Sequence, residues 1–247
     1  MSTSKDYLEN FIKTLEENNL LREINRSKSG IELFTEKYRI YIYPPNQPRV
    51  NSTSRLLTIH LDVDLLASSL SKIVQRVKGL HGLGERIFAR QAVVARIDKR
   101  IAMEFLEEHH LQVALAGKYR YGLFYQGELV SVAVFSGGRK MNQMQSDYRS
   151  FELLRFCHKS DLAVIGGISK LIQAFVKDFN PQDIMTYSDK DWGGESSLQK
   201  IGFVIEGETA PQRFYIQNGQ RKYTIDDGEK CDYEIENCGS LKLKLYL

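Results

Sequence analysis

Two glycines stand where a helix is predicted to begin, at a position suited to anion binding. The segment GGISK (residues 166–170) opens the helix predicted over residues 167–179. Glycines there let a ligand approach the backbone, where free N–H groups and the helix dipole bind anions such as a pyrophosphate. Lys170 would add a charge-assisted contact. The alternative is a tight turn without a ligand. The predicted anion-binding residues are Gly166, Gly167, Ile168, Ser169 and Lys170.

The segment YSDKDW (residues 187–192) ends the next predicted strand with further reactive groups. At a strand end near the glycine turn, Asp189 would act as a general base on an amine or orient it, with Tyr187 beside the substrate. For Asp189 the alternative is an Asx-turn or a helix N-cap. Trp192, the single tryptophan, would stack on a base or adenine, or else plug a hydrophobic gap.

Three more polar side chains are candidates for the same site. Glu152 and Arg155 lie three residues apart on the strand predicted over residues 151–157, so we expect them to point to opposite faces. Glu152 is a candidate catalytic group, and Arg155 is a candidate substrate contact or a structural ion-pair partner. His110 ends the helix predicted over residues 98–110, where it would serve the site or complement the helix dipole.

Positive charge is concentrated between residues 72 and 100. This segment contains eight basic residues and only two acidic ones, Glu85 and Asp98. A basic patch of this size attracts phosphates. The alternative is a solvated helix face with salt-bridge partners. The predicted nucleic-acid-binding residues are Lys72, Arg76, Lys78, Arg86 and Arg90.

The composition is that of a soluble globular protein, with 42% apolar residues, 26% charged residues and a net charge of +3. These values exclude a disordered chain, a collagen-like repeat and a small disulfide scaffold. No apolar stretch approaches the roughly 20 residues that a bilayer requires. Three cysteines without a CxxC pair predict reduced thiols in a cytoplasmic protein. No metal-ligand spacing is present, so we expect no metal.

The order of predicted elements indicates an α/β (α+β) fold. Hydrophobic patterns predict an N-terminal helix, several strands, and then an antiparallel hairpin at residues 119–135. A strand–helix–strand–helix–strand series follows from residue 151 to residue 217. Antiparallel strands followed by this alternation imply a mixed sheet flanked by helices.

This series resembles the GNAT superfamily of acyl-CoA-dependent N-acyltransferases. The strand, glycine turn, helix and strand are followed by K-x-G-F at residues 200–203, and the hairpin GLFYQGELVSVAVF resembles that family's central strands. The resemblance covers residues 86–247 and implies acetyl-CoA or another acyl-CoA as donor. Its pyrophosphate would lie on residues 166–170, and a β-bulge with splayed strands would hold the thioester near Glu152 and Leu153.

A closer resemblance is to the C-terminal region of phage homing-endonuclease-associated proteins. The shared motifs occur in order as I-x-A-R (87–90), E-F-L-x-x-x-H-x-Q (104–112), G-L-x-Y…E-L-V-S (122–131), E-L-x-R-F-C (152–157), V-x-G-G-x-S-K-L (164–171), Y-x-D-x-x-W (187–192) and L-x-K-x-G-F (198–203). Mom-like DNA-modification enzymes are placed in the same broad fold, which implies a nucleic-acid acceptor.

Two positions depart from the GNAT pattern. Many members carry a tyrosine that protonates the departing CoA thiolate, and the matching residue here is Leu198. Residues 162–164 are apolar where the family has an arginine or glutamine before the glycines. We therefore expect the thiolate to leave unassisted or to take its proton from water.

The N-terminal third resembles a degenerate nuclease of the restriction-endonuclease type. Such nucleases hold a metal with carboxylates and a lysine on one strand pair. Glu32, Asp62 and Asp64 are present but do not form a D…ExK arrangement, so we expect no nuclease activity. The predicted domains are a smaller α/β region over residues 1–85 and a GNAT-like domain over residues 86–247.

Two functions follow from these patterns. The first is an N-acyltransferase that moves an acyl group from acyl-CoA to an amine, with a nucleobase or nucleic acid as a candidate acceptor. The second is a catalytically inactive GNAT-like protein that binds nucleic acid through its basic segment. No membrane partner is expected in either case.

Overall fold

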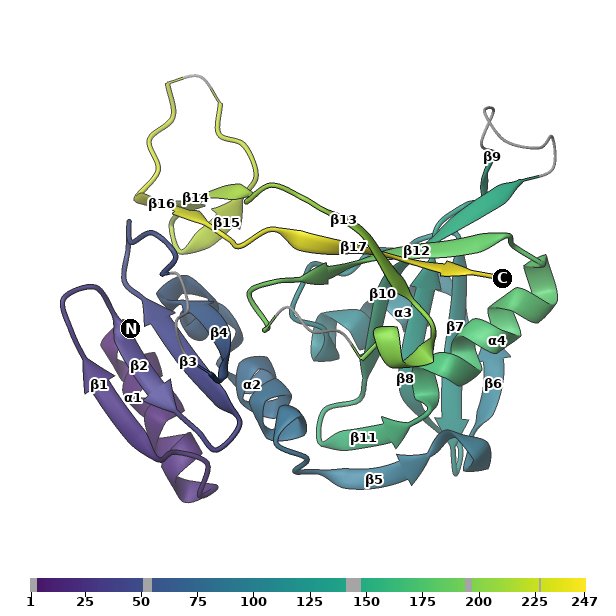
Figure 1. The fold of residues 1–247 in the computed structure, drawn as a ribbon, viewed down its shortest axis with the longest axis horizontal. Helices are drawn as coiled ribbons and strands as arrows, with labels where there is room; N and C mark the ends of the chain where they lie inside the picture. Colours follow the sequence, from purple (N-terminus) through teal and green to yellow (C-terminus); the bar gives the residue numbers. More distant parts are fainter. Residues whose placement is uncertain (1–3, 51–54, 141–147, 194–196, 227) are drawn as a thin grey trace. The chain divides into compact units, whose positions relative to one another are not determined.

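The computed structural model describes residues 4–50, 55–140, 148–193, 197–226 and 228–247 (Figure 1). Contacts group the chain into two units. The first unit contains Met1–Val74, Ser188–Glu195 and Glu208–Leu241, and the second contains Gln75–Tyr187, Ser196–Gly207 and Lys242–Leu247. Segments far apart in the sequence therefore build the first unit. None of the described helices is long and apolar enough to cross a membrane.

The first unit holds a mixed sheet and a small antiparallel sheet. The mixed sheet has the order β1-β2-β3-β4, in which β3 and β4 run parallel and the other neighbours antiparallel. The small sheet has the order β15-β14-β16. The elements are α1 (Ser4–Glu17), β1 (Glu23–Arg26), β2 (Ile31–Phe34), β3 (Tyr38–Tyr43), β4 (Leu57–Asp62), β14 (Arg213–Gln217), β15 (Gln220–Lys222) and β16 (Tyr233–Glu236). Helix α2 (Val63–Leu80) follows β4 and contributes residues to both units.

The second unit is built on a larger mixed sheet with the order β13-β17-β12-β10-β8-β7-β6, and β9 adds to β10. Strands β10 and β12 run parallel, whereas β10–β8, β8–β7 and β7–β6 are antiparallel. This confirms the predicted mixed sheet. Its strands are β6 (Val93–Arg96), β7 (Tyr119–Tyr125), β8 (Glu128–Phe135), β9 (Arg139–Lys140), β10 (Arg149–His158), β12 (Asp183–Asp189), β13 (Val204–Glu208) and β17 (Ser240–Tyr246).

Two helices cover opposite faces of this sheet (Figure 1). Side chains alternate along β8, so Val132 and Val134 pack with α3 (Lys99–His109), whereas Phe135 points the other way. Phe135 stacks on Phe175 of α4 (Gly167–Phe179), with ring centroids 4.0 Å apart. The sheet is therefore flanked by helices, as the sequence predicts.

Two predicted elements are wrong in part. Residues 87–97 do not form one strand, because β5 (Glu85–Phe88) ends at the 3-10 turn η1 (Ala89–Gln91) before β6 begins. Strand β5 instead pairs in parallel with β11 (Leu162–Ile165), a strand not predicted from sequence. In place of a helix over residues 196–203, the described residues form only the 3-10 turn η2 (Gln199–Ile201); residue 196 lies outside them.

Candidate active site

The glycine turn that precedes α4 has the geometry expected of an anion site. Gly166 adopts a left-handed conformation with φ of 78°, which favours glycine, and α4 begins at Gly167. In an α-helix the first N–H groups have no intrahelical acceptor, so those of Gly167, Ile168 and Ser169 are available to a ligand. They lie at the positive end of the helix dipole, where an anion is stabilised.

The turn is held from behind by η1. The Nζ atom of Lys170 donates to the carbonyl oxygens of Ala89 and Ala92, at 2.9 and 2.6 Å. A Cβ atom at Gly166 would lie 3.8 Å from the Cβ of Ala89, so the two backbones are neighbours. The ammonium predicted to contact an anion thus fixes η1 against the first turn of α4.

Strands β10 and β12 separate next to this turn. In the parallel pair, residues 150–152 of β10 lie opposite residues 183–185 of β12. One residue further along, the Thr186 hydroxyl donates a hydrogen bond to the Leu153 carbonyl at 2.8 Å. Beyond that point β10 pairs with β8 alone, although both strands are described to their ends. Ligands of open sheets bind where neighbouring parallel strands separate at their carboxyl ends.

A β-bulge in β10 changes which residues share a face. The register with β8 shifts between Leu153 and Arg155, which leaves Leu154 as the extra residue. The bulge reverses the alternation, so Glu152 and Arg155 lie on the same face of the sheet. The prediction that they point to opposite faces is wrong for this reason. Arg155 donates to the carbonyls of Val113 and Leu154, at 2.9 and 2.7 Å.

Glu152 lies at the last paired position before the strands separate. Its side chain is 19% exposed, and the nearest described cation is Arg139, with an N–O distance of 4.0 Å. Its backbone N–H donates to Ser136 Oγ at 2.9 Å, which fixes the strand beside it. A carboxylate at this place is positioned to accept a proton from a group in the gap between β10 and β12.

A partly buried histidine behind the turn was not predicted from the sequence. His158 ends β10, and its Nδ1 lies 2.7 Å from Ser131 Oγ. Burial lowers the pKa of His158 from 6.5 to about 4. A Cβ atom at Gly167 would come within 2.9 Å of the ring, so only glycine fits there without displacement. Simple alternation along β10 places His158 on the same face as Glu152, away from α4, so the sequence pattern did not indicate this contact.

The other candidates lie at strand and helix ends. Tyr187 and Asp189 stand two residues apart near the end of β12, and the side chain of Tyr187 is exposed. His110 follows α3, and its Nδ1 accepts a hydrogen bond from the Gln112 N–H at 3.0 Å.

Asp189 and Trp192 belong to the first unit. Asp189 Oδ1 accepts from the backbone N–H of Asp191 at 3.0 Å, which is the Asx-turn geometry. Trp192 forms an isolated bridge with Ile59 of β4. Their assignment to catalysis and substrate binding stays a prediction.

The predicted basic residues do not act as one set of free cations. Lys78 pairs with Asp161 at 3.9 Å, and Lys72 and Arg76 each have interactions of their own. Arg86 and Arg90 are exposed. Among the residues that the structure describes, no acidic group pairs with either of these two.

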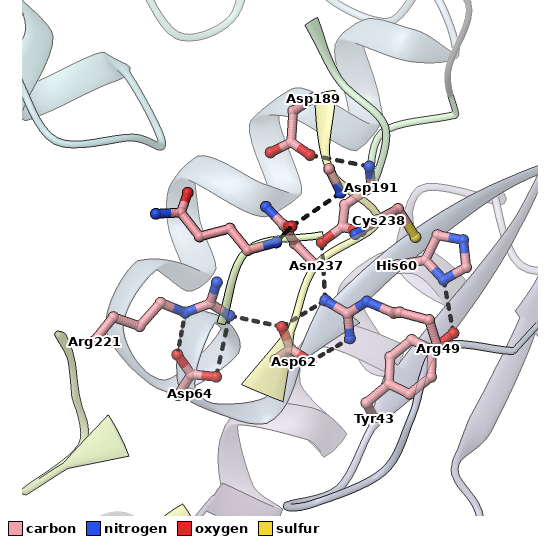
Figure 2. Close-up of polar contacts among 12 residues, drawn as sticks. Tyr43, Arg49, His60, Asp62, Asp64, Asp189, Asp191, Arg221, Asn237 and Cys238 are labelled. Carbon is pink, nitrogen blue, oxygen red and sulfur yellow. Dashed lines mark hydrogen bonds and ion pairs between the residues drawn. The ribbon is translucent and has the colours of Figure 1, made fainter. Parts of the chain in front are cut away.

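The first unit contains a buried charge network that sequence spacing does not reveal (Figure 2). Arg49 binds Asp62 with two hydrogen bonds of 2.6 and 2.8 Å, and it binds Asp191 at 2.8 Å. Arg221 binds Asp62 at 2.7 Å and Asp64 at 2.6 Å. The three carboxylates are buried. The resemblance to a nuclease singled out Asp62 and Asp64 as possible metal ligands. In the structure both carboxylates are bound by guanidinium groups instead.

No group of three or more His, Cys, Asp or Glu side chains suited to a metal ion occurs in the described part of the chain. The carboxylates instead accept hydrogen bonds from arginine, which cannot be deprotonated in a protein. Hydrogen bonding to Asp62 and Asp191 raises the pKa of Arg49 above its usual value despite the cost of burial.

His60 lies beside this network and is neutral. The Tyr43 hydroxyl oxygen lies 2.6 Å from His60 Nδ1 and accepts a hydrogen bond from the Val50 N–H. Burial lowers the pKa of His60 from 6.5 to about 4, although the charge of Asp191 opposes the shift.

A cavity of about 730 Å³ adjoins the network, within the same unit. Its lining includes Arg49, Arg55, His60, Lys190 and Cys238. The charge of Arg49 is balanced by its carboxylates, and Lys190 pairs with Glu208 at 2.6 Å. Burial raises the pKa of the Cys238 thiol to about 12, so this cysteine is not a nucleophile at neutral pH.

Comparisons with known proteins return structures but no sequence family. No protein-family model matches the chain, and no curated protein matches it. Similar solved structures include a GNAT family acetyltransferase from Elizabethkingia anophelis with acetyl-CoA bound, at 14% identity and a TM-score of 0.34, over 64% of this chain and 99% of that one.

Two further structures are similar to the same extent. A Bacillus subtilis acetyltransferase in complex with CoA has 18% identity and a TM-score of 0.35, over 63% of this chain and 99% of that one. A GNAT family acetyltransferase from Streptococcus pneumoniae has 9% identity and a TM-score of 0.40, over 63% and 99%. A likeness of this degree assigns no activity to the chain.

Replacing Arg49 by methionine tests the charge network. Arg49→Met leaves Asp191 buried without its cation and Asp62 with Arg221 alone, so we expect the free energy of unfolding to fall by about 3–5 kcal/mol. Urea denaturation followed by circular dichroism measures the loss. Arg213→Met is the matched control, because Arg213 pairs with Glu234 and Glu236 at the surface of the same unit. Equal loss in both variants would contradict the role of burial.

The two neutral histidines make stability depend on pH. In the unfolded chain each takes up a proton below its ordinary pKa of 6.5, whereas in the folded chain His60 and His158 stay neutral to about pH 4. Acidification from pH 6.5 towards 4 therefore favours unfolding, by at most about 1.4 kcal/mol per pH unit for each histidine.

This pH dependence is measured by urea denaturation between pH 7 and 5. His60→Asn keeps a hydrogen-bonding partner for the Tyr43 hydroxyl and should flatten the loss of stability on acidification. NMR titration of the ring provides the direct check. A His60 ring that gains its proton near pH 6.5 in the folded protein would disprove the assignment.

Proposed function

We propose that the chain is an N-acyltransferase that moves an acyl group from acyl-CoA to an amine. The separation of β10 and β12 beside the first turn of α4 carries this proposal. The turn offers N–H donors to a pyrophosphate, and the gap offers an unpaired edge of β10 to the arm that bears the thioester. The sequence resemblance to the GNAT superfamily supports the same reading independently.

The donor set fits a CoA pyrophosphate. The N–H groups of Gly167, Ile168 and Ser169 supply hydrogen bonds, and Gly166 keeps the approach free of a side chain. When bound, acyl-CoA supplies the activated acyl thioester. Acetyl-CoA is the simplest donor of this class.

Glu152 is the best placed of the predicted catalytic groups. The amine nitrogen attacks the thioester carbonyl, a C–N bond forms, and the C–S bond breaks. Glu152 takes the proton that the amine loses, while Asp189 and His110 already accept hydrogen bonds from the backbone. The thiolate leaves unassisted or takes a proton from water, because Leu198 has no proton to give.

The acceptor is the finer part of the proposal. The resemblance to phage homing-endonuclease-associated and Mom-like proteins supports an amine on a nucleobase or nucleic acid. The divisions at residues 1–85 and 86–247, the degenerate nuclease origin of the first and a cytoplasmic location stay predictions from the sequence. Binding of nucleic acid without acyl transfer is the rival outcome of the tests below.

Calorimetric titration with acetyl-CoA tests donor binding. We expect the unmodified protein to bind and Ser169→Glu to lose binding, because a carboxylate in the first turn repels the pyrophosphate but suits the helix dipole. Gln173→Glu adds the same charge at an exposed position of α4 and should still bind. Absence of binding at millimolar acetyl-CoA would disprove the proposal.

Release of CoA thiol in the presence of amines tests catalysis. Acceptors would include polyamines, peptides and DNA oligonucleotides. Glu152→Gln should slow transfer by about 10²–10⁴-fold without changing acetyl-CoA affinity, because only the proton acceptor is removed. Glu128→Gln is the matched control, since Glu128 pairs with Lys159 at the surface. Unchanged turnover in Glu152→Gln would remove Glu152 from the reaction.

A further inference from the structure

The outer side of the β5–β11 pair is a small flat surface next to the glycine turn. Ile87 and Val164 point inward and are buried, whereas Phe88 and Ile165 are 43% and 50% exposed. Phe88 and Ile165 are register partners, and Arg86 is the partner of Ala163 one step along the same face. We call Arg86, Phe88, Ala163 and Ile165 the outer face of β5–β11.

Two arginines flank the apolar part of this face. Arg86 lies two residues before Phe88 on β5, so both side chains point outward. Arg90 follows Phe88 in η1, and its guanidinium carbon lies 4.9 Å from the centre of the Phe88 ring. Neither arginine pairs with an acidic residue in the described ranges, so both charges are available to an anion.

The outer face is continuous with the donors at the start of α4. Ile165 is followed directly by Gly166, and Ala89 between Phe88 and Arg90 adjoins Gly166. The two hydrogen bonds from Lys170 to Ala89 and Ala92 fix η1 in this place. A ligand whose pyrophosphate lies on the turn would extend its next group over Ile165 and Phe88.

We propose that the outer face of β5–β11 binds the 3′-phosphoadenosine part of acyl-CoA, an inference that rests on the proposed function. The adenine ring stacks on Phe88 and Ile165, and the 3′-phosphate receives hydrogen bonds from Arg86 and Arg90. The ligand has a flat adenine ring next to a doubly charged phosphate. The protein offers a flat apolar surface next to two guanidinium groups that pair with no acidic residue in the described ranges.

The distribution of charge favours a nucleotide over a nucleic-acid backbone. Duplex binding needs several cations spaced along a phosphate track. Here Lys78 is paired with Asp161, and Lys72 and Arg76 have other interactions. Of the two remaining arginines, Arg90 lies over the Phe88 ring and Arg86 lies two residues before Phe88 on the same face, which suits a single phosphate group and a single base.

Calorimetry with CoA and dephospho-CoA, which lacks the 3′-phosphate, tests this site. We expect the unmodified protein to bind CoA about tenfold more tightly, the effect of one charge-assisted contact. Arg86→Ala and Arg90→Ala should each weaken CoA binding and leave dephospho-CoA binding unchanged. Phe88→Ala should weaken both ligands by about tenfold, because the ring contact is common to them. Arg100→Ala on α3 is the control, since Arg100 is exposed and faces Glu104.

The outcomes separate the two proposals. Equal affinity for CoA and dephospho-CoA, with no effect of the arginine variants, overturns the 3′-phosphate site and leaves acyl-CoA binding intact. Binding of neither ligand by the unmodified protein overturns both proposals. If Arg86→Ala and Arg90→Ala reduce affinity for a DNA duplex but not for CoA, these arginines serve nucleic acid and the nucleotide site is wrong.

Discussion

Backbone pairing along β10 controls the architecture of the second unit. Its first residues pair with β12, and past Glu152 the strand keeps only β8 as a neighbour. A strand that loses one neighbour has N–H and C=O groups that need another partner. Because the chain between β10 and β12 runs through α4, the N-terminus of this helix lies at the same edge. One change in pairing therefore creates both an open strand edge and a cluster of helix donors.

The bulge in β10 adds a second effect. The extra residue reverses the alternation of side chains, so Glu152 and Arg155 share the face covered by α3, while His158 faces α4. Without it, the acid and the arginine would be on different faces and His158 would point away from Gly167. The extra residue thus fixes which groups surround the opening between β10 and β12.

Elements with strong local signals could be predicted from the sequence. The bounds of α4 and β12 agree with the pattern of apolar residues, and Asp98 caps α3 through a 2.9 Å hydrogen bond from the Ile101 N–H. The resemblance to the GNAT superfamily implied a bulge near Glu152 and Leu153, and the register shift lies there, but nothing in ELLRF itself marks one residue as unpaired. The β5–β11 pair was missed because its partners are far apart in sequence and each strand is too short to show alternation.

The charge network of the first unit shows the same limit and has a consequence for how the protein is made. Asp62 meets Arg49, 13 residues away, but its other cation is Arg221, 159 residues further along the chain. During synthesis on the ribosome, β4 and the start of α2 emerge long before Arg221 is translated. Until then Asp64 lacks the cation it binds in the folded protein and Asp62 has Arg49 alone, and burial of a carboxylate without a cation is costly. The buried network of the first unit is therefore completed only after residue 221 has been translated.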